Sequence, residues 1–438
     1  MALKDTRDRN DTKDSCDFCA FLWLFPLLPS TLLSEGQMLA SIAIFLGSYL
    51  VFAIGNFPGM KIDRPGAAII GAVLMFGFRV VNPADAFLFI DFSTIVLLFS
   101  MMLIVGNLHL VGFFEWIAEV AIRRLHPRHL LPTVIIASGV LSAFFVNDII
   151  CLVMVPLVLS ITRRMRVLPL PFLLATATAS NIGSVATITG NPQNMLIGSF
   201  SGIGYRDFLF HLGPVAAVGL VLDWAVLHWL YLREPSADTL VDEAIPAPVE
   251  RPQMRKTAFV MALVVGAFFA GVPPALSSAV GAAVLLIGRT LEPRELYDEV
   301  DWGLLVFFIG LFLIVGGAEK AGITDRLIEF ARHWNLQHTT SFTLITAGLS
   351  NVLSNVPAVM LLKSLIPGFA DPHTAWLILA MASTLSGNLT ITGSVANIIV
   401  VERARPDVTI GFREYFRTGF PVTLATLLFG WAWLTLVR

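Results

Sequence analysis

Charged side chains are scarce in this chain of 438 residues. Asp, Glu, Lys and Arg make up 14% of it, whereas soluble domains carry about 25%. Hydrophobic residues reach 56% and the mean hydropathy is +0.78, which is more apolar side chain than a water-soluble core hides. The composition therefore excludes a soluble enzyme, a disordered scaffold and a coiled coil. It predicts an all-α polytopic membrane protein.

Other absences exclude further classes. The net charge of −2 gives no basic surface for nucleic acid, so no nucleic-acid partner is expected. Three cysteines, Cys16, Cys19 and Cys151, are too few for a disulfide framework. The chain has no HExxH, GxSxG or Walker A motif. We therefore expect neither an enzyme nor built-in ATP drive, and no resident cofactor or certain metal site.

Apolar runs divide the chain into membrane segments, since a spanning helix needs about 20 apolar residues. The spans expected in the first half are 37–55, 64–80, 91–107 and 208–232. Segment 113–129 is amphipathic and is expected at the interface. Two longer runs are interrupted: 130–161 at Asn147-Asp148, which predicts a re-entrant hairpin, and 170–200 at residues 187–192, which predicts a broken helix.

The same order starts again after a polar, proline-containing stretch, residues 233–256, which we interpret as a cytoplasmic linker. Spans are expected at 257–271, 276–291, 301–317 and 418–437, with an amphipathic helix at 320–334. A second hairpin is expected at 340–367, interrupted around Asn355, and a second broken helix at 375–401, interrupted at residues 388–394.

The two halves share three matched motifs in the same order. Residues 91–106 match 301–316, 141–147 match 349–355, and the Thr-Ile-Thr-Gly runs at 187–190 and 390–393 are identical. Each half has five crossings, an odd number, so the second half enters from the opposite face. The chain is therefore predicted to be an inverted-topology repeat, 37–232 and 257–438, which is typical of secondary transporters with a site between broken helices.

Basic residues are distributed unevenly over the two faces of this topology. It places 18 of the 29 lysines and arginines on one face and seven on the other, with four in the N-terminal tail. The richer face, called the basic face below, is expected to be cytoplasmic. The predicted location is the inner cell membrane.

The N-terminal tail, residues 1–36, allows three readings. Its apolar run 18–33 has the length of a signal-peptide core, but it has acidic flanks and no clear cleavage site. It is alternatively an extra span, or the product of a start assigned too early, since Met38 opens the first good span. Cys16 and Cys19 form a CxxC without a partner pair, which is interpreted as incidental.

Breaks in membrane helices expose backbone groups that only protein or a water-filled cavity satisfies. Half-helix N-termini then offer N–H donors and partial positive charge to an anion. Asn147 and Asn355, one at each tip, are expected to contact substrate or ion, or else to cap the helix. Asp148 is a carboxylate at membrane depth, where charge is costly and by default functional. It binds Na⁺, carries a proton, or caps the second half-helix.

The remaining candidate residues share a place in the breaks or beside a tip. Their hydroxyls bind a ligand or only their own backbone, their glycines allow close approach, and their asparagines are ligands or caps. They are Asn181, Gly183, Ser184, Thr187, Thr189, Gly190, Asn191, Asn194, Ser354, Asn388, Thr390, Thr392, Gly393, Ser394 and Asn397. Lys363 and Asp223 are weaker candidates, for anion attraction and for coupling respectively.

The interrupted segments also carry a family likeness. Asn147-Asp148, residues 181–194, Ser354-Asn355 and residues 387–397 resemble the ion transporter superfamily, which includes citrate and dicarboxylate transporters, arsenite permeases and a class of sodium–proton antiporters. In the dicarboxylate branch each tip carries Ser-Asn-Thr. Here the tips read Val146-Asn147-Asp148 and Ser354-Asn355-Val356. The first looks more like the arsenite and antiporter branches, and the run 190–194 looks like that of uncharacterised bacterial anion permeases.

The resemblance implies a function. We expect a secondary active transporter of a small anion or oxyanion, whether carboxylate, arsenite-type or inorganic, coupled to an ion gradient or the membrane potential. The coupling ion is Na⁺ or H⁺, with Na⁺ near Asn147, Asp148 and Asn355. The alternative is a sodium–proton antiporter on the same fold, and an ion channel is a third class. The resemblance also implies a homodimer in the bilayer.

Overall fold

The computed structural model describes residues 33–437 except 56–61, 125, 232–250, 288–291 and 334–335. The predictions for the N-terminal tail, including Cys16 and Cys19, lie outside these residues, as does most of the predicted linker. Within the described residues every regular element is a helix. Five helices, α2, α5, α11, α15 and α21, are long and apolar enough to cross a membrane.

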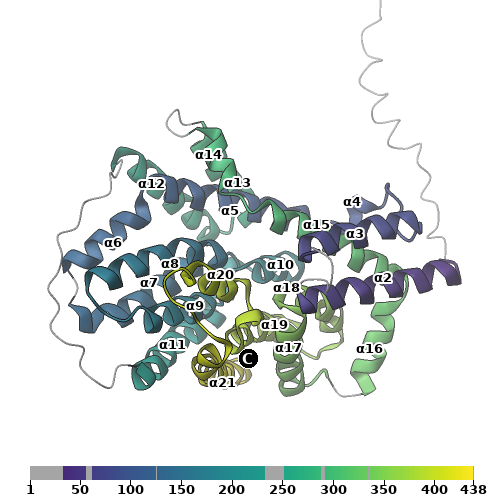
Figure 1. Ribbon diagram of the computed structural model, residues 1–438. Helices are drawn as coiled ribbons and strands as arrows, with labels where there is room; N and C mark the ends of the chain where they lie inside the picture. Colours follow the sequence, from purple (N-terminus) through teal and green to yellow (C-terminus); the bar gives the residue numbers. More distant parts are fainter. Residues whose placement is uncertain are drawn as a thin grey trace, which may run out of the picture.

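The first repeat follows the predicted order (Figure 1). Its elements are α2 (Glu35–Ile54), α3 (Arg64–Gly77), α4 (Ala86–Phe89), α5 (Phe92–Leu110), α6 (Phe113–Arg124), η1 (Pro127–His129), α7 (Leu130–Phe144), α8 (Asn147–Arg164), α9 (Leu170–Ser184), α10 (Pro192–Ser201) and α11 (Tyr205–Tyr231). The hairpin is α7–α8, and the broken helix is α9–α10. Only the short α4 was not expected.

The second repeat has the same series of elements. They are α12 (Arg251–Phe269), α13 (Pro274–Leu286), α14 (Pro293–Asp298), α15 (Trp302–Lys320), α16 (Ile323–His333), α17 (Thr339–Leu353), α18 (Asn355–Leu362), η2 (Lys363–Gly368), α19 (Pro372–Leu385), η3 (Ser386–Leu389), η4 (Ile391–Gly393), α20 (Val395–Ala404) and α21 (Phe412–Leu436). Helix α12 begins at Arg251, within the stretch assigned to the linker. The hairpin is α17–α18, and the broken helix is α19–α20.

Side-chain caps explain where several helices begin. Ser34 and Gln37 form a capping box at the start of α2. Asp91 and Asp301 stand at equivalent places in the two repeats, and each accepts a backbone N–H in the first turn, of α5 and α15 respectively. Such caps satisfy N–H groups that the helix leaves free. These caps define the first residue of each helix, which the apolar pattern alone locates only approximately.

The two helix breaks are braced in the same way. The Asn194 amide donates to the carbonyls of Ser184 and Thr187, both at 3.0 Å. The Asn397 amide donates to the carbonyls of Gly387 at 2.7 Å and Thr390 at 3.0 Å, which are the same ten and seven residues upstream. The carbonyls that the breaks free are thus satisfied by protein, as membrane depth requires.

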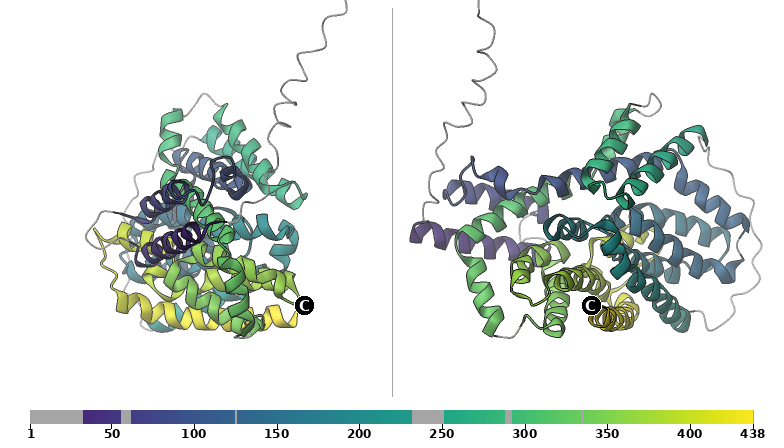
Figure 2. Two further views of the ribbon diagram at one scale, coloured as in Figure 1. Left: turned by 90° about the vertical axis from the view of Figure 1, so that its right-hand side faces the viewer. Right: turned by 180° about the vertical axis from the view of Figure 1, so that it is seen from behind.

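The repeats are interlocked by exchanged contacts. Helix α3 packs on α15 and α13 on α5, while α20 packs on α8 and α10 on α18, so each contact pairs opposite repeats. In Figure 1 the α7–α8 hairpin lies at the left and α17–α18 towards the right, with α10 and α20 between them. In the two turned views of Figure 2, α12 and α14 again lie along the upper edge and α21 along the lower edge. The predicted fold class, an inverted repeat with two hairpins and two broken helices, is confirmed.

Candidate functional site

A cavity of about 300 Å³ lies where the two hairpin tips meet. The described residues that line it are Asp63, Arg64, Pro65, Asn147, Asp148, Pro192, Gln193, Asp301, Gly303, Leu304, Phe307, Ser354, Asn355, Val356, Ser394 and Val395. Both tips and both breaks contribute to it. The two tips and the two breaks, which the sequence predicts to come together, therefore line one cavity.

Six helices begin at this cavity: α3, α8, α10, α15, α18 and α20. Asp63 and Asp301 cap α3 and α15, each accepting a backbone N–H at 2.9 Å. By contrast α8, α18 and α20 begin without a side-chain cap. Helix N-termini carry partial positive charge and free N–H groups. Their convergence makes the cavity wall a donor surface suited to an anion.

The ionisable groups at the cavity are few. Arg64 is the one basic residue among the described residues that line it, and its Nε donates to the Phe52 carbonyl at 3.1 Å. Asp148 is half-buried at the first tip, and its carboxyl faces the backbone N–H of Ala396 in the first turn of α20. Asp63 and Asp301 are exposed, so the cavity reaches the surface beside them. One guanidinium and three carboxyl groups, two of which cap helices, thus set the local charge.

Each tip asparagine is hydrogen-bonded to the broken helix of its own repeat. Asn147 is 2% exposed and donates from its backbone to the Gly190 carbonyl at 3.0 Å. The Asn355 amide, oriented to satisfy its neighbours, donates to the Ser383 carbonyl at 2.9 Å and the Gly393 carbonyl at 3.1 Å. The Oδ1 atom of Asn147 is buried and has no hydrogen-bond partner among the described residues. An unpaired buried acceptor costs free energy and is available to a donor on a ligand.

Asn181 is the hub of the polar groups behind the cavity. It accepts hydrogen bonds from the Asn147 amide and the Ser394 hydroxyl, both at 3.0 Å. It donates to Asn388 Oδ1 at 2.8 Å and Asn397 Oδ1 at 2.9 Å. These four bonds use the full capacity of an asparagine side chain. Because the partners belong to both repeats, Asn181 ties the first tip to the second break.

Most of the other predicted residues support the site rather than line it. Asn191 accepts from the Asn194 backbone N–H as cap of α10 and donates to Ser184 Oγ at 2.9 Å and Thr384 Oγ1 at 3.2 Å. Gly183 packs on the backbone of Gly139, where any Cβ would collide. The remaining residues of this supporting set are Thr187, Thr189, Gly190, Asn194, Asn388, Thr390, Thr392, Gly393 and Asn397.

Some residues at the cavity were missed by the sequence analysis. Arg64 and Asp301 come from the first turns of distant helices, and Gln193 donates to Thr384 Oγ1 at 3.1 Å. The match of Asp301 to Asp91 between the repeats was the only signal for this group. Lys363, a weaker candidate, pairs instead with Glu319 at 3.3 Å, away from the cavity. Asp223 is fully buried in α11, and it too does not line the cavity.

Ser354 holds the second tip in a strained conformation. Its φ of 74° and ψ of 159° fall in a region that is essentially restricted to glycine. It is one of three non-glycine residues with positive φ among the described residues. Such strain costs of order 1–3 kcal/mol and tends to cluster at ligand sites. The backbone at this tip is therefore held in place by its surroundings.

A second cavity, of about 360 Å³, occupies the equivalent place in the other half. It is lined by the starts of α5 and α13, the counterparts of α15 and α3, but by neither hairpin tip. Ile188 of the first break and Tyr205 both line it, and the Tyr205 hydroxyl bonds Thr189 at 3.0 Å while its ring packs on Phe268. Thr189 is fully buried, whereas its counterpart Thr392 is exposed. The two halves thus differ in access.

Comparisons with known proteins agree with this architecture. A citrate transporter family matches residues 49–386. An uncharacterized transporter of Mycobacterium tuberculosis, Rv2685, is 31% identical over 89% of this chain and 96% of its own length. The silicon efflux transporter LSI3 of Oryza sativa subsp. japonica is 29% identical over the same shares of the two chains.

A solved structure shares the fold. The crystal structure of the Alcanivorax borkumensis YdaH transporter, whose title notes an unusual topology, matches with a TM-score of 0.58. The match covers 92% of this chain and 98% of the other, at 14% identity. The family and these relatives are transporters rather than enzymes, as predicted. With the family match spanning most of the chain, this integral membrane protein belongs to the citrate transporter family.

Proposed function

We propose that the protein is a secondary active transporter of a small anion or oxyanion and that the cavity at the two tips is its substrate site. The observation that carries the proposal is the convergence of six helix N-termini on that cavity. Uncapped N-termini and the Arg64 guanidinium attract negative charge. Asn147, Asn355 and Gln193 supply neutral hydrogen-bonding groups that fix orientation.

The charge at the cavity favours a substrate with one or two negative charges, or a weak oxyacid. A single guanidinium faces three carboxylates, and two of these, Asp63 and Asp301, are occupied in capping. Multiply charged anions usually need several fixed cations. The hydroxyl and amide lining suits the oxygens of an oxyanion. The printed name of the rice relative, a silicon efflux transporter, adds silicic acid to the arsenite-type and carboxylate candidates.

We propose a proton as the coupling ion, bound at Asp148. An ionised carboxylate at membrane depth is costly, and the described groups that act on this one are the Asp301 carboxylate and the Ala396 backbone N–H. A sodium ion needs a shell of several oxygen ligands, whereas the described hydrogen-bond contact of the Asp148 carboxyl is a single backbone N–H, that of Ala396. A proton needs only the carboxylate oxygen. Its uptake removes the charge that opposes an anion, which couples the two binding events.

Alternating access has a structural basis in the two cavities. The tip cavity opens beside Asp63 and Asp301, which begin helices at the basic face of the predicted topology. The second cavity lies at the opposite face of that topology, and Tyr205 lies between it and Thr189 of the first break. Exchange of these two arrangements between the repeats moves the site from one face to the other.

The first experiment measures thermal stability of the detergent-purified protein against a ligand panel. Citrate, succinate, sulfate, phosphate, arsenite and silicic acid are each added in Na⁺ and in K⁺ buffers. A ligand at about 100 times its Kd stabilises the folded state by about 2.7 kcal/mol. A shift with one anion, independent of Na⁺, supports the proposal. A shift with Na⁺ alone and none with any anion favours the sodium–proton antiporter.

The second experiment tests Asp148 in liposomes with an imposed pH gradient. The Asp148→Asn variant is expected to bind the anion found in the first experiment, but the pH gradient should no longer speed the transport of that anion. Asp148→Glu, which keeps a titratable group, is expected to retain part of this acceleration. Asp301→Asn is the matched control, because it removes a carboxylate of the same cavity that serves as a cap. Gradient-driven flux in Asp148→Asn equal to that of the wild type contradicts the coupling role.

Two further expectations remain predictions. The homodimer implied by the family resemblance is tested by the mass of the detergent-solubilised protein in light scattering. The inner cell membrane as its location is tested by fractionation of cells that express the chain. Neither bears on the chemistry of the cavity.

A further inference from the structure

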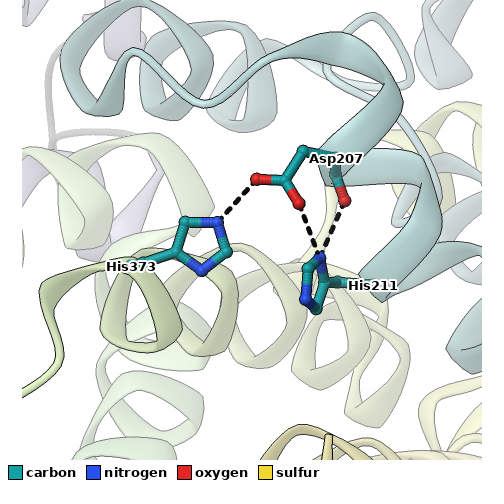
Figure 3. Close-up of side chains that lie close together, drawn as sticks. All are labelled: Asp207, His211 and His373. Atoms are coloured by element: carbon teal, nitrogen blue, oxygen red, sulfur yellow. Dashed lines mark hydrogen bonds and ion pairs between the residues drawn. The ribbon is translucent and has the colours of Figure 1, made fainter. Parts of the chain in front are cut away.

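A second polar cluster lies far from the cavity, where the two repeats meet at their ends. Asp207 and His211 stand in the first turns of α11, and His373 stands in the first turn of α19. The ligand atoms of the three side chains lie within 4.8 Å of one another. Figure 3 shows both imidazole rings turned towards the one carboxylate, each from its own helix. None of the three lines the tip cavity.

The hydrogen bonds in the cluster are short and share a single acid. Asp207 Oδ2 lies 2.7 Å from His373 Nε2. His211 Nδ1 lies 2.9 Å from the Asp207 backbone carbonyl oxygen and 3.0 Å from Oδ1, so a metal ion at this nitrogen replaces its contact with the carbonyl. The two rings meet edge to face, with centroids 5.2 Å apart. The side chains are 18–45% exposed, so the cluster is reachable from solvent. Two imidazoles and a carboxylate are the ligands that zinc and similar ions prefer.

We propose that Asp207, His211 and His373 form a binding site for one divalent transition-metal ion of the zinc class. Zinc bonds to imidazole nitrogen and carboxylate oxygen are about 2.0–2.2 Å long, which separates tetrahedral ligands by about 3.4 Å. The nitrogen–oxygen separations of 2.7 and 3.0 Å widen by about 0.7 and 0.4 Å to reach that value, and the two ring nitrogens, at most 4.8 Å apart, move closer to reach it. Three protein ligands leave the fourth position to water, as at zinc sites that are not purely structural.

The placement of the site gives a bound ion a mechanical role. Trp433, near the end of α21, donates to the His211 carbonyl at 2.9 Å. The ends of three spans, from both repeats, therefore meet there. On the predicted topology this is the face opposite the basic one. Helix α19 runs from His373 directly into the second break. A metal ion at the cluster fastens this end of α19 to α11 and opposes their separation.

Cobalt binding to the full-length protein tests the site. The protein is freed of any histidine tag, stripped with EDTA and titrated with Co²⁺, whose visible absorption is intense only in low-coordinate sites with few waters. We expect one equivalent to bind, to give that spectrum and to be displaced by Zn²⁺. His373→Gln and His211→Gln are each expected to weaken binding at least tenfold. Two variants are made because His211 also packs beside Trp433.

Two controls separate the cluster from other ligands in the chain. His228→Gln removes an exposed histidine at the far end of α11 and is expected to bind Co²⁺ like the wild type. Cys16→Ser with Cys19→Ser removes the thiol pair of the tail and is also expected to bind normally. Zn²⁺ should raise the melting temperature of the wild type and of these controls, but not of His373→Gln.

The outcomes decide between a metal site and a plain hydrogen-bonded link. Binding that is unchanged in both His211→Gln and His373→Gln overturns the proposal. So does the absence of any visible spectrum at millimolar Co²⁺ in the wild type. Loss of binding in the cysteine variant alone assigns the metal to the tail and also overturns it. None of these results depends on the identity of the transported anion.

Discussion

The buried amide of Asn181 offers the sharpest test of what holds the site together. Its side chain is inaccessible to solvent and makes four side-chain hydrogen bonds between 2.8 and 3.0 Å. Asn181→Leu keeps the branching and the number of side-chain heavy atoms but leaves two buried donors and two buried acceptors without this partner. A buried polar group left unpaired costs about 1–3 kcal/mol. Taking the low end for each, we expect a loss of at least about 4 kcal/mol of folding free energy.

Thr176→Val on the same helix is the matched control. Thr176 is equally buried, but its hydroxyl bonds only the Phe172 carbonyl at 2.8 Å, so the expected loss is about 1 kcal/mol. Both variants are unfolded with increasing SDS in mixed micelles and compared with the wild type by their free energies of unfolding. A difference between the two variants of less than about 1 kcal/mol refutes the idea that Asn181 is the hub joining the repeats.

Three further substitutions, with Gly47→Ala as a control, test the second tip, the contact of Tyr205 with the first break and the packing of α9. Ser354→Gly removes the strain at the second tip, so a rise of about 1 kcal/mol in stability is expected in thermal melts, and a fall contradicts it. Tyr205→Phe loses the bond to Thr189 and should speed hydrogen exchange across the first break; an unchanged rate argues against a role of this bond in holding the break. Gly183→Ala collides with backbone and should abolish folded protein in size-exclusion chromatography. Gly47→Ala, which meets nothing within 4 Å, should not.

The repeat was predictable because identical sequence motifs meet identical backbone needs. Asn194 and Asn397 stand at the same place after each Thr-Ile-Thr-Gly run, and each bonds the carbonyls ten and seven residues upstream. A break in a membrane helix must satisfy its own carbonyls locally. The residues that satisfy these carbonyls therefore lie within a dozen positions of one another, and the spacing of the motif in the sequence is enough to identify them.

The cavity was less predictable because part of its wall comes from far along the chain. Arg64 and Asp301 stand at the first turns of α3 and α15, where a charged residue next to a span has an ordinary explanation as an interface anchor. Their approach to Asn147 depends on how α3 and α15 pack around the tips, and no local pattern encodes that packing. The same holds for the Asp207–His373 pair, whose partners are 166 residues apart.

The identical Thr-Ile-Thr-Gly runs also show what sequence identity leaves open. Thr189 is buried beneath Tyr205, whereas Thr392 is exposed. The four residues of each run are the same, so the difference arises from what surrounds each run, such as Tyr205 over Thr189. An inverted repeat that adopts one of two equivalent arrangements must place matched residues in unlike surroundings. For such a pair of matched residues, the sequence predicts that one is buried and the other exposed, but it does not predict which of the two is buried.

The cross-repeat bonds limit which parts can move during transport. Ser394 of the second break bonds Asn181 of the first repeat, and Asn191 of the first break bonds Thr384 of the second. The hairpin tips and helix breaks of the two repeats thus form one hydrogen-bonded polar core. If the two repeats slid apart at this core, its cross-repeat bonds would be lost, and the bonds of Asn181 alone would cost at least about 4 kcal/mol. By contrast, the starts of α3 and α15 at one cavity and of α5 and α13 at the other reach the surface. The change of access from one face to the other that breaks the fewest hydrogen bonds is therefore a movement of the whole core between the α3–α15 pair and the α5–α13 pair.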